Sequence, residues 1–155
     1  MQTVRQHKQV KIGEKMPARG SIRLVIADDR VPAREGLKAL LAAPDPTIGR
    51  RLWDQECLPI QVVGEANDGI QAVQLVDLLQ PDVVIMDVRM PGMDGIQATR
   101  MIKSKFDEVG VIILSMYGAH REEALQAGAD AFLLKGCPPE TLLECLVKIG
   151  LKLGG

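Results

Sequence analysis

Short apolar runs alternate with amphipathic stretches along the chain from Ile22 to Ile149. Each run spans four to six residues that are largely apolar, a pattern that predicts strands buried on both faces. The predicted strands are Ile22–Ala27, Ile60–Gly64, Val83–Met86, Val109–Leu114 and Ala129–Leu134.

Between and after these strands, apolar residues recur at the spacing of a helix face, as in Ile70, Val73 and Val76. Pro32 suits a first helical turn, where its missing N–H costs nothing. The predicted helices are Pro32–Ala43, Asp68–Leu79, Asp94–Lys105, His120–Ala127 and Pro139–Ile149. Single helices between doubly buried strands predict an α/β fold, with a parallel sheet covered on both faces.

Three segments fall outside this alternation. Residues 1–20 show no periodicity and are predicted to form a flexible basic tail. The 16 residues Pro44–Pro59 far exceed the ~2–6 residues of a usual αβ connection, so we interpret them as an insertion, either an ordered loop or an extended first helix. The sequence therefore predicts one domain over 21–150, with the insertion at 44–59, a short tail at 151–155 and no effector domain.

Composition and charge exclude few function classes. The 155 residues are 46% apolar and carry a net charge of −1, so overall charge favours neither nucleic acid nor membrane as a partner. The three cysteines show no CxxC spacing, which argues against a disulfide framework. No apolar run approaches the ~18 residues of a membrane span, and the N-terminus lacks the apolar centre of a signal peptide. We expect a cytoplasmic protein.

Polar side chains follow four of the predicted strands. They are Asp28 and Asp29 after the first strand, Asp87 after the third, Ser115 after the fourth and Lys135 after the fifth. Ligands of doubly wound sheets bind beyond the carboxyl ends of the strands, so we expect these groups at one edge. Clustered carboxylates repel one another unless a cation joins them, and oxygen ligands suit Mg²⁺. The sequence therefore predicts a magnesium site.

The same groups suit phosphoryl transfer. A carboxylate can attack phosphorus to form an acyl phosphate, and catalysis of that step consists mostly of positioning and neutralising phosphoryl oxygens. Mg²⁺, the Lys135 ammonium and the Ser115 hydroxyl would supply the neutralisation. Taken singly, Asp28 or Asp29 is compatible with a helix cap, and Ser115 with a turn hydroxyl. Their combination with Asp87 and Lys135 at four strand ends favours a functional site.

Four segments carry a family resemblance. They are LVIADD (Leu24–Asp29), PDVVIMDVRMPGMDG (Pro81–Gly95), VIILSMY (Val111–Tyr117) and AGADAFLLKG (Ala127–Gly136). Together they resemble the receiver domains of two-component response regulators, in particular the NarL/FixJ (LuxR-type) group, because all four fall in order with compatible spacing. The resemblance covers Ser21 to about Ile149. It implies a flavodoxin-like sheet of five parallel strands in the order 2-1-3-4-5.

The resemblance also implies a role for each acidic residue. Asp87 is expected to be phosphorylated by a sensor histidine kinase. Asp29 and Asp87 are the expected direct ligands of Mg²⁺, with Asp28 acting mainly through water. The backbone carbonyl of Arg89 is expected to complete the protein's share of the metal site.

Further roles follow from the same resemblance. Ser115 is expected to move toward the phosphoryl group, Phe132 to change rotamer with it, and Lys135 to contact a phosphoryl oxygen, although Phe132 is equally suited to a plain core position. Arg89 and Tyr117 lie two residues after Asp87 and Ser115, and we predict that they partly shield the acyl phosphate from water.

The output expected from the resemblance is regulation of transcription. The chain would be the receiver part of a transcriptional regulator that catalyses only its own phosphorylation and dephosphorylation. We expect a possible homodimer on phosphorylation, and no direct contact of this chain with nucleic acid or membrane. The alternative is a single-domain receiver that acts through protein contacts.

Two features depart from the family pattern. The interval from Ser115 to Lys135 is 20 residues, a couple fewer than usual, and the missing residues fall at Gly118–His120 before the fourth helix. This shortening puts the usual switching geometry in question. Gly136 stands where many receivers have a proline in a cis bond, so no cis bond is predicted there.

Three other functions use similar parts. A phosphatase of the haloacid dehalogenase type needs a second aspartate two residues after its nucleophile, where this chain has Arg89. A flavin-binding module would want a phosphate-binding loop after the first strand, where Asp28 and Asp29 would repel phosphate. A pseudo-receiver without phosphorylation is disfavoured because all five strand-end polar groups are retained.

Overall fold

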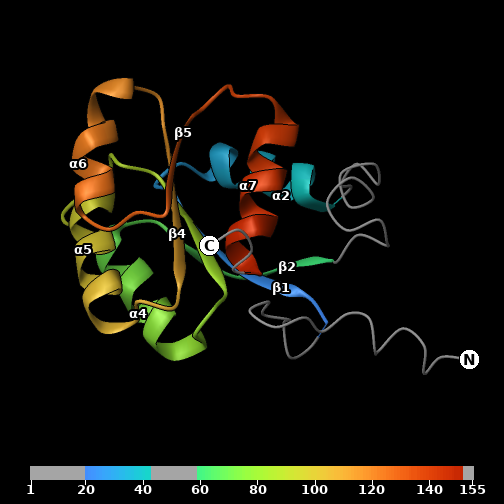
Figure 1. Cartoon of the computed structure of the whole chain (residues 1–155), viewed down its shortest axis with the longest axis horizontal. Helices are drawn as coiled ribbons and strands as arrows, with labels where there is room; N and C mark the ends of the chain where they lie inside the picture. The colour runs from blue at the N-terminus through green and yellow to red at the C-terminus, as the bar shows by residue number, and fades with distance from the viewer. Residues whose placement is uncertain (1–19, 43–58, 152–155) are drawn as a thin grey trace, which may run out of the picture.

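The computed structural model describes residues 20–42 and 59–151. The predicted tail at 1–20 and the insertion at 44–59 therefore lie almost wholly outside the described residues, as do residues 152–155 of the C-terminal tail. A parallel sheet in the order β2-β1-β3-β4-β5 occupies the centre (Figure 1). Its strands are β1 Ile22–Ala27, β2 Ile60–Ala66, β3 Val83–Met86, β4 Gly110–Ser115 and β5 Ala131–Leu134. This order confirms the expected flavodoxin-like sheet.

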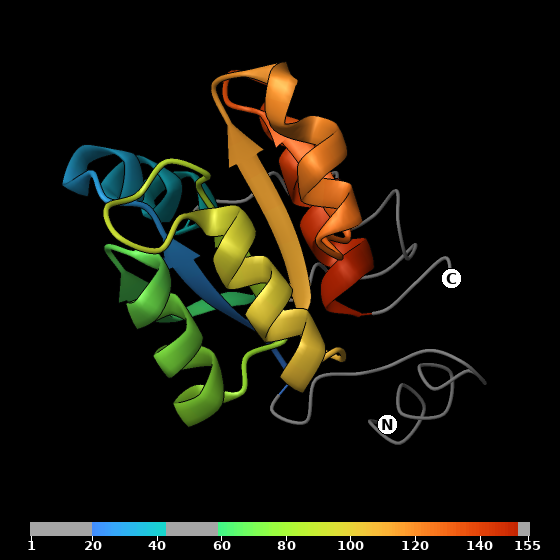
Figure 2. The ribbon, with the colours of Figure 1, turned by 90° about the vertical axis from the view of Figure 1, so that its left-hand side faces the viewer.

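Helices cover both faces of the sheet. In Figure 1, α4, α5 and α6 lie on one side of the strands and α2 and α7 on the other, and Figure 2 shows the first group in front of the sheet. The helices are α2 Val31–Ala42, α4 Gly69–Leu79, α5 Gly95–Lys105, α6 Arg121–Gln126 and α7 Pro139–Gly150. None of the helices in the described ranges is long and apolar enough to cross a membrane.

Alternation along β1 shows how one sheet supports two cores. Ile22, Leu24 and Ile26 pack with residues of α2 and α7. Val25 and Ala27 pack with residues of α4, α5 and α6. Successive strand residues point to opposite faces, so a strand with helices on both sides must be apolar throughout. This requirement explains why β1 is apolar at every position except Arg23, near its amino end.

The helix starts follow local capping chemistry. Asp68 accepts a hydrogen bond from Gln71 N at 2.8 Å and caps α4. Asp94 accepts from Gln97 N at 2.8 Å while the Gln97 side chain bonds back to Asp94 N at 3.0 Å, a reciprocal capping box at the start of α5. The predicted helices Asp68–Leu79 and Asp94–Lys105 are therefore confirmed, with the aspartates as caps.

The fourth predicted helix, His120–Ala127, is observed as the short α6 Arg121–Gln126. A 3-10 turn, η1 at Gly118–His120, leads into it. The shortened segment after β4 leaves little chain to reach α6, and a 3-10 turn spans more length per residue than an α-helix. The chain therefore enters α6 tightly, close to the carboxyl end of β4.

Two glycines shape the loop between β3 and α5. Gly92 has φ +70°, which a type II turn with Pro91 before it requires. A Cβ on Gly95 would collide with the carbonyl oxygen of Asp87, so only glycine permits this approach. The loop is thus folded back against the end of β3.

Candidate functional site

Three carboxylates meet where β1 and β3 end. Asp28 and Asp29 follow β1 and Asp87 follows β3, and these strands are parallel neighbours. One oxygen of each carboxylate lies within 4.8 Å of the others. Asp28 and Asp87 are buried, whereas Asp29 is exposed. The structure therefore brings together the acidic residues that the sequence placed at one edge.

Lys135 brings a positive charge to this cluster. Its backbone N–H donates to the Ser115 carbonyl at 2.7 Å, which continues the pairing of β4 and β5. Its side-chain Nζ lies 2.9 Å from Asp28 Oδ2 and 3.5 Å from Asp87 Oδ1. The predicted lysine is thus at the site and bridges two carboxylates.

Asp87 has one occupied and one open oxygen. Oδ1 accepts a hydrogen bond from Val88 N at 2.9 Å and faces Lys135. Oδ2 has no partner among the described residues, and it is not a buried unsatisfied atom, so it faces solvent. Burial raises the pKa of Asp87 above its ordinary value; Lys135 opposes that shift and Asp28 adds to it. The carboxylate charge here exceeds what the lysine compensates.

Both carboxylate oxygens and both backbone polar groups of Asp28 have partners. Its Oδ1 accepts from Arg30 N at 2.9 Å and its Oδ2 pairs with Lys135. Its backbone N–H donates to the Ala66 carbonyl at 3.0 Å, and its carbonyl accepts from Arg34 Nη1 at 2.6 Å. Because α2 begins at Val31, the bond to Arg30 N closes a turn before the helix, so the alternative of Asp28 as its cap is not what the structure has.

Ser115 lies at the same edge with a local partner. The side chain is 2% exposed, and Oγ accepts from Tyr117 N at 3.1 Å and is 3.3 Å from the Tyr117 carbonyl. Phe132 is buried in the core on the α6 side, with the Arg121 guanidinium 5.8 Å from its ring centre. The structure thus places Ser115 at the same sheet edge as the acidic cluster, with its hydroxyl bonded within its own turn.

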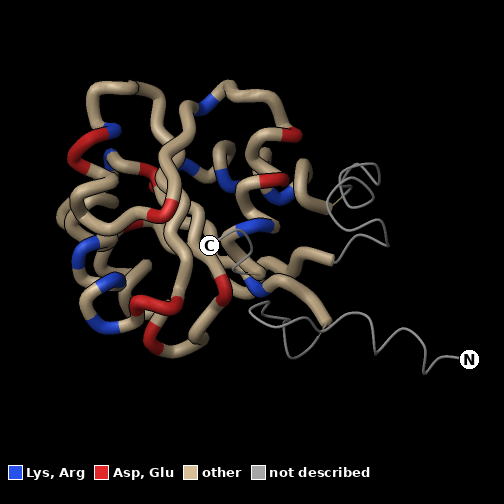
Figure 3. The backbone as a smooth tube through the Cα atoms, in the orientation of Figure 1, with Lys and Arg blue, Asp and Glu red and all other residues tan. Residues whose placement is uncertain are grey.

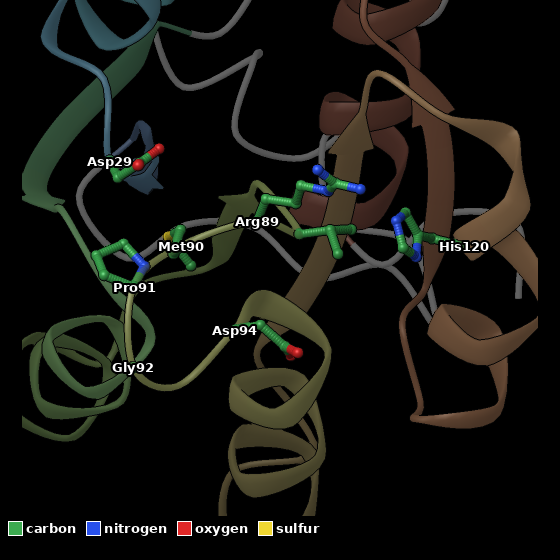
Figure 4. A pocket seen from close by; sticks show the side chains of 8 residues that line it. Asp29, Arg89, Met90, Pro91, Gly92, Asp94 and His120 are labelled. Atoms are coloured by element: carbon green, nitrogen blue, oxygen red, sulfur yellow. The ribbon is translucent and has the colours of Figure 1, made fainter.

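A pocket of about 610 Å³ opens beside the cluster. It is lined by Asp29, Val88, Arg89, Met90, Pro91, Gly92, Asp94 and His120. Figure 4 shows Asp29 and His120 on opposite sides of the pocket with Arg89 between them. The Arg89 guanidinium lies 5.2 Å from the ring centre of Tyr117, a cation–π contact that joins the two residues expected to shield the site.

Three residues of this region were not predicted from the sequence. His120 and Asp94 line the pocket, and Arg34 bonds to the carbonyl of Asp28. His120 falls in the shortened segment, and that unusual spacing was its only signal. Asp94 was recognised solely as a helix start, and Arg34 lies inside α2, where a charged residue ordinarily faces solvent.

Known proteins identify the family. Residues 48–147 match the family model of the response regulator receiver domain, a range that holds Asp87, Ser115 and Lys135 but begins after Asp28 and Asp29. The chain is 38% identical over 125 residues to the uncharacterized transcriptional regulatory protein YhcZ of Bacillus subtilis (strain 168), which covers 79% of this chain and 52% of that protein.

A nitrate/nitrite response regulator and a solved structure are also similar to this chain. Identity is 35% over 127 residues to the nitrate/nitrite response regulator protein NarL of Escherichia coli (strain K12), covering 79% of this chain and 52% of NarL. A two-component response regulator of the LuxR family from Aurantimonas sp. SI85-9A1 superimposes with a TM-score of 0.68 at 30% identity, covering 84% of this chain and 85% of that chain. The chain spans about half the length of the two regulators compared by sequence. It belongs to the response regulator receiver domain family, and its relatives are regulators of the NarL and LuxR type.

Proposed function

We propose that this domain is a phosphorylation-dependent switch that accepts a phosphoryl group on Asp87 from a sensor histidine kinase. The observation that carries the proposal is the open Oδ2 of Asp87 beside a carboxylate cluster and a lysine. Oδ2 would attack the phosphorus of a phosphohistidine, forming a P–O bond as the P–N bond breaks. The imidazole leaves with that electron pair and takes up a proton.

Three residues near Asp87 would assist its phosphorylation in different ways. Lys135 Nζ, 3.5 Å from Asp87 Oδ1, would neutralise a phosphoryl oxygen. The Ser115 hydroxyl would exchange its bonds to Tyr117 for one to the phosphoryl group, with Phe132 changing rotamer behind it. The domain would catalyse only its own phosphorylation and dephosphorylation.

The donor set fits a hard divalent cation, which we propose to be Mg²⁺. Three carboxylates with one lysine leave negative charge that such an ion would compensate. Asp29 and Asp87 would be direct ligands, together with the backbone carbonyl of Arg89. Asp28 would act mainly through water, because Arg30 N and Lys135 already occupy its two oxygens. When bound, the ion supplies charge neutralisation for the phosphoryl oxygens.

We further propose that the domain, over residues 21–150, is the receiver part of a transcriptional regulator. Two relatives bear such names, and the chain spans half of their length. Phosphorylation would shift a pre-existing equilibrium in the faces of α6 and α7, with homodimerisation as the expected output. Acidic and basic residues are interspersed along the described chain (Figure 3), which supports contact with proteins rather than with nucleic acid. A single-domain receiver acting through protein contacts is the alternative.

The phosphatase alternative is further weakened by Arg89. A haloacid dehalogenase needs an acid and base at this position, and an arginine side chain offers only hydrogen-bond donors. It also stacks on Tyr117. Neither property suits proton transfer to a leaving group.

Incubation with acetyl phosphate and Mg²⁺, followed by intact-mass measurement, tests the assignment. The protein should gain the mass of one phosphoryl group, and Asp87→Asn or excess EDTA should abolish the gain. Asp68→Asn is the matched control, since it also alters an aspartate after a strand but asparagine caps α4 equally well. A gain that persists in Asp87→Asn, or no gain in the unaltered protein, would contradict the proposal.

A further inference from the structure

Arg34 connects the acidic loop to the rest of the fold. It lies in the second turn of α2, and its Nη1 donates to the carbonyl oxygen of Asp28 at 2.6 Å. Its Nε lies 3.0 Å from Glu65 Oε1 on β2. The side chain is 15% exposed. A short charge-assisted bond on one side and an ion pair on the other leave the guanidinium little freedom.

Glu65 anchors this arginine. Its second oxygen, Oε2, pairs with Lys38 Nζ at 2.8 Å, so one carboxylate on β2 binds cations from two successive turns of α2. The next residue of β2, Ala66, accepts the backbone N–H of Asp28 at 3.0 Å. The amide and the carbonyl of Asp28 are therefore both held by groups whose position depends on the end of β2.

The bond from Arg34 has a direct consequence for Asp29. The carbonyl that Arg34 binds belongs to the peptide group between Asp28 and Asp29. Because a peptide group is planar, holding its oxygen also fixes the orientation of the bond that leads to Asp29. The Asp29 carboxylate itself is exposed and has no hydrogen bond or ion pair with any described residue. Its placement within 4.8 Å of the other carboxylates depends on the loop backbone.

We propose that Arg34, anchored by Glu65, is a positioning residue for the divalent cation. It holds the Asp28–Asp29 peptide so that the Asp29 carboxylate meets Asp87, without touching the cation itself. This inference rests on the proposed metal site. Outer partners of this kind commonly change metal affinity by about 10-fold or more when removed.

The positive charge of Arg34, acting alone, would have the opposite effect on cation binding. Arg34 is a cation close to three carboxylates, so its removal should strengthen cation binding if electrostatics were its only influence. Loss of positioning should weaken binding instead. The sign of the change therefore separates the two accounts.

Lys38 supplies a matched control. It lies on the same helix and pairs with the same carboxylate, but it has no contact with the acidic loop among the described residues. Lys38→Gln also removes one positive charge. It disturbs the contact of α2 with β2 and leaves the Asp28 carbonyl bonded to Arg34.

The test is Mg²⁺ binding to the unphosphorylated full chain by isothermal titration calorimetry. We expect Arg34→Gln to raise the dissociation constant about 10-fold and Lys38→Gln to leave it unchanged or slightly lower it. Arg34→Lys should also weaken binding, because an ammonium lacks the forked donors with which the guanidinium binds Asp28 and Glu65. Circular dichroism checks the folding of each variant, and Arg34→Lys, which keeps the charge, carries the test if Arg34→Gln does not fold.

Labelling with acetyl phosphate over a range of Mg²⁺ concentrations gives a second readout. Arg34→Gln should need more Mg²⁺ for half-maximal rate while approaching the unaltered maximal rate at saturation. Equal or tighter Mg²⁺ binding by Arg34→Gln would overturn this inference alone. Failure of the unaltered protein to bind Mg²⁺ would overturn the metal site, and this inference with it.

Discussion

The two ends of the sheet use the same residue types for different purposes. At the amino end, Asp130 Oδ2 accepts from Val111 N at 2.8 Å and from Lys103 Nζ at 3.0 Å. Asp82 Oδ2 accepts from Arg23 N at 2.8 Å, and the Arg23 guanidinium donates to backbone carbonyls nearby. Each aspartate there has its own backbone partner, and the basic side chains complete the set.

At the carboxyl end, three aspartates cluster, and two of them, Asp28 and Asp87, face Lys135. Asp28 is fully bonded, but Asp87 keeps one open oxygen and Asp29 has no partner among the described residues. Charge that is buried without enough partners is costly, and a fold retains it only where something else compensates. Both ends of the sheet contain aspartate and lysine. What distinguishes the candidate site from the structural ion pairs at the amino end is that its carboxylates have fewer partners.

Removal of the Lys135 side chain should have the largest effect on the difference between the two ends of the sheet. Lys135→Met takes away the cation next to Asp87 and should slow phosphorylation by acetyl phosphate about 100-fold, the usual cost of losing one charge-stabilising donor. Time courses of intact mass at saturating Mg²⁺ measure the rate. Lys103→Met, at the opposite end of the sheet, should keep the normal rate. A Lys135→Met rate close to that of the unaltered protein would remove Lys135 from the mechanism.

Removal of Asp130 should affect stability instead. Asp130→Ala leaves Val111 N and Lys103 without their carboxylate and should lower the free energy of unfolding by about 2 kcal/mol. Urea denaturation measures the loss, and phosphorylation below the unfolding transition should be unchanged. The comparison between the two ends fails if Asp130→Ala leaves stability intact or abolishes phosphorylation.

The sequence predicted the fold well because its signals are local. The runs Ile22–Ala27 and Val83–Met86 coincide with β1 and β3, since strands buried on both faces are largely apolar. Polar residues directly after such runs can be assigned to the carboxyl edge without knowing the packing. Asp28, Asp29, Asp87, Ser115 and Lys135 were therefore placed correctly at one edge.

The missed features depend on packing between distant segments. Arg34 and Glu65 are 31 residues apart, and their contact exists only because α2 lies against β2. His120 lines the pocket from η1, the 3-10 turn directly before α6. Neither periodicity nor a motif encodes these contacts. The bond of Ser115 to Tyr117 N was likewise beyond sequence reasoning, because it depends on the conformation of the turn after β4.

Substitution of Arg89 or Tyr117 should have the smallest effect on the difference between the two ends of the sheet. We predict that this cation–π pair shields the acyl phosphate, so Arg89→Ala or Tyr117→Ala should admit water and shorten its lifetime. A contact worth about 0.5–1 kcal/mol corresponds to a change of about 2- to 5-fold. Decay of the phosphorylated protein after removal of acetyl phosphate measures it.

The double variant tests whether the two residues act as one cover. Residues in direct contact couple, so Arg89→Ala with Tyr117→Ala should hydrolyse scarcely faster than either single variant. Arg121→Ala alters a second arginine–aromatic pair and should leave the lifetime unchanged, because its partner Phe132 is buried in the core. Fully additive effects would mean that each residue shields the site separately. Unchanged hydrolysis in all variants would mean that the open oxygen of Asp87 is protected by the bound cation and Lys135 rather than by this cover.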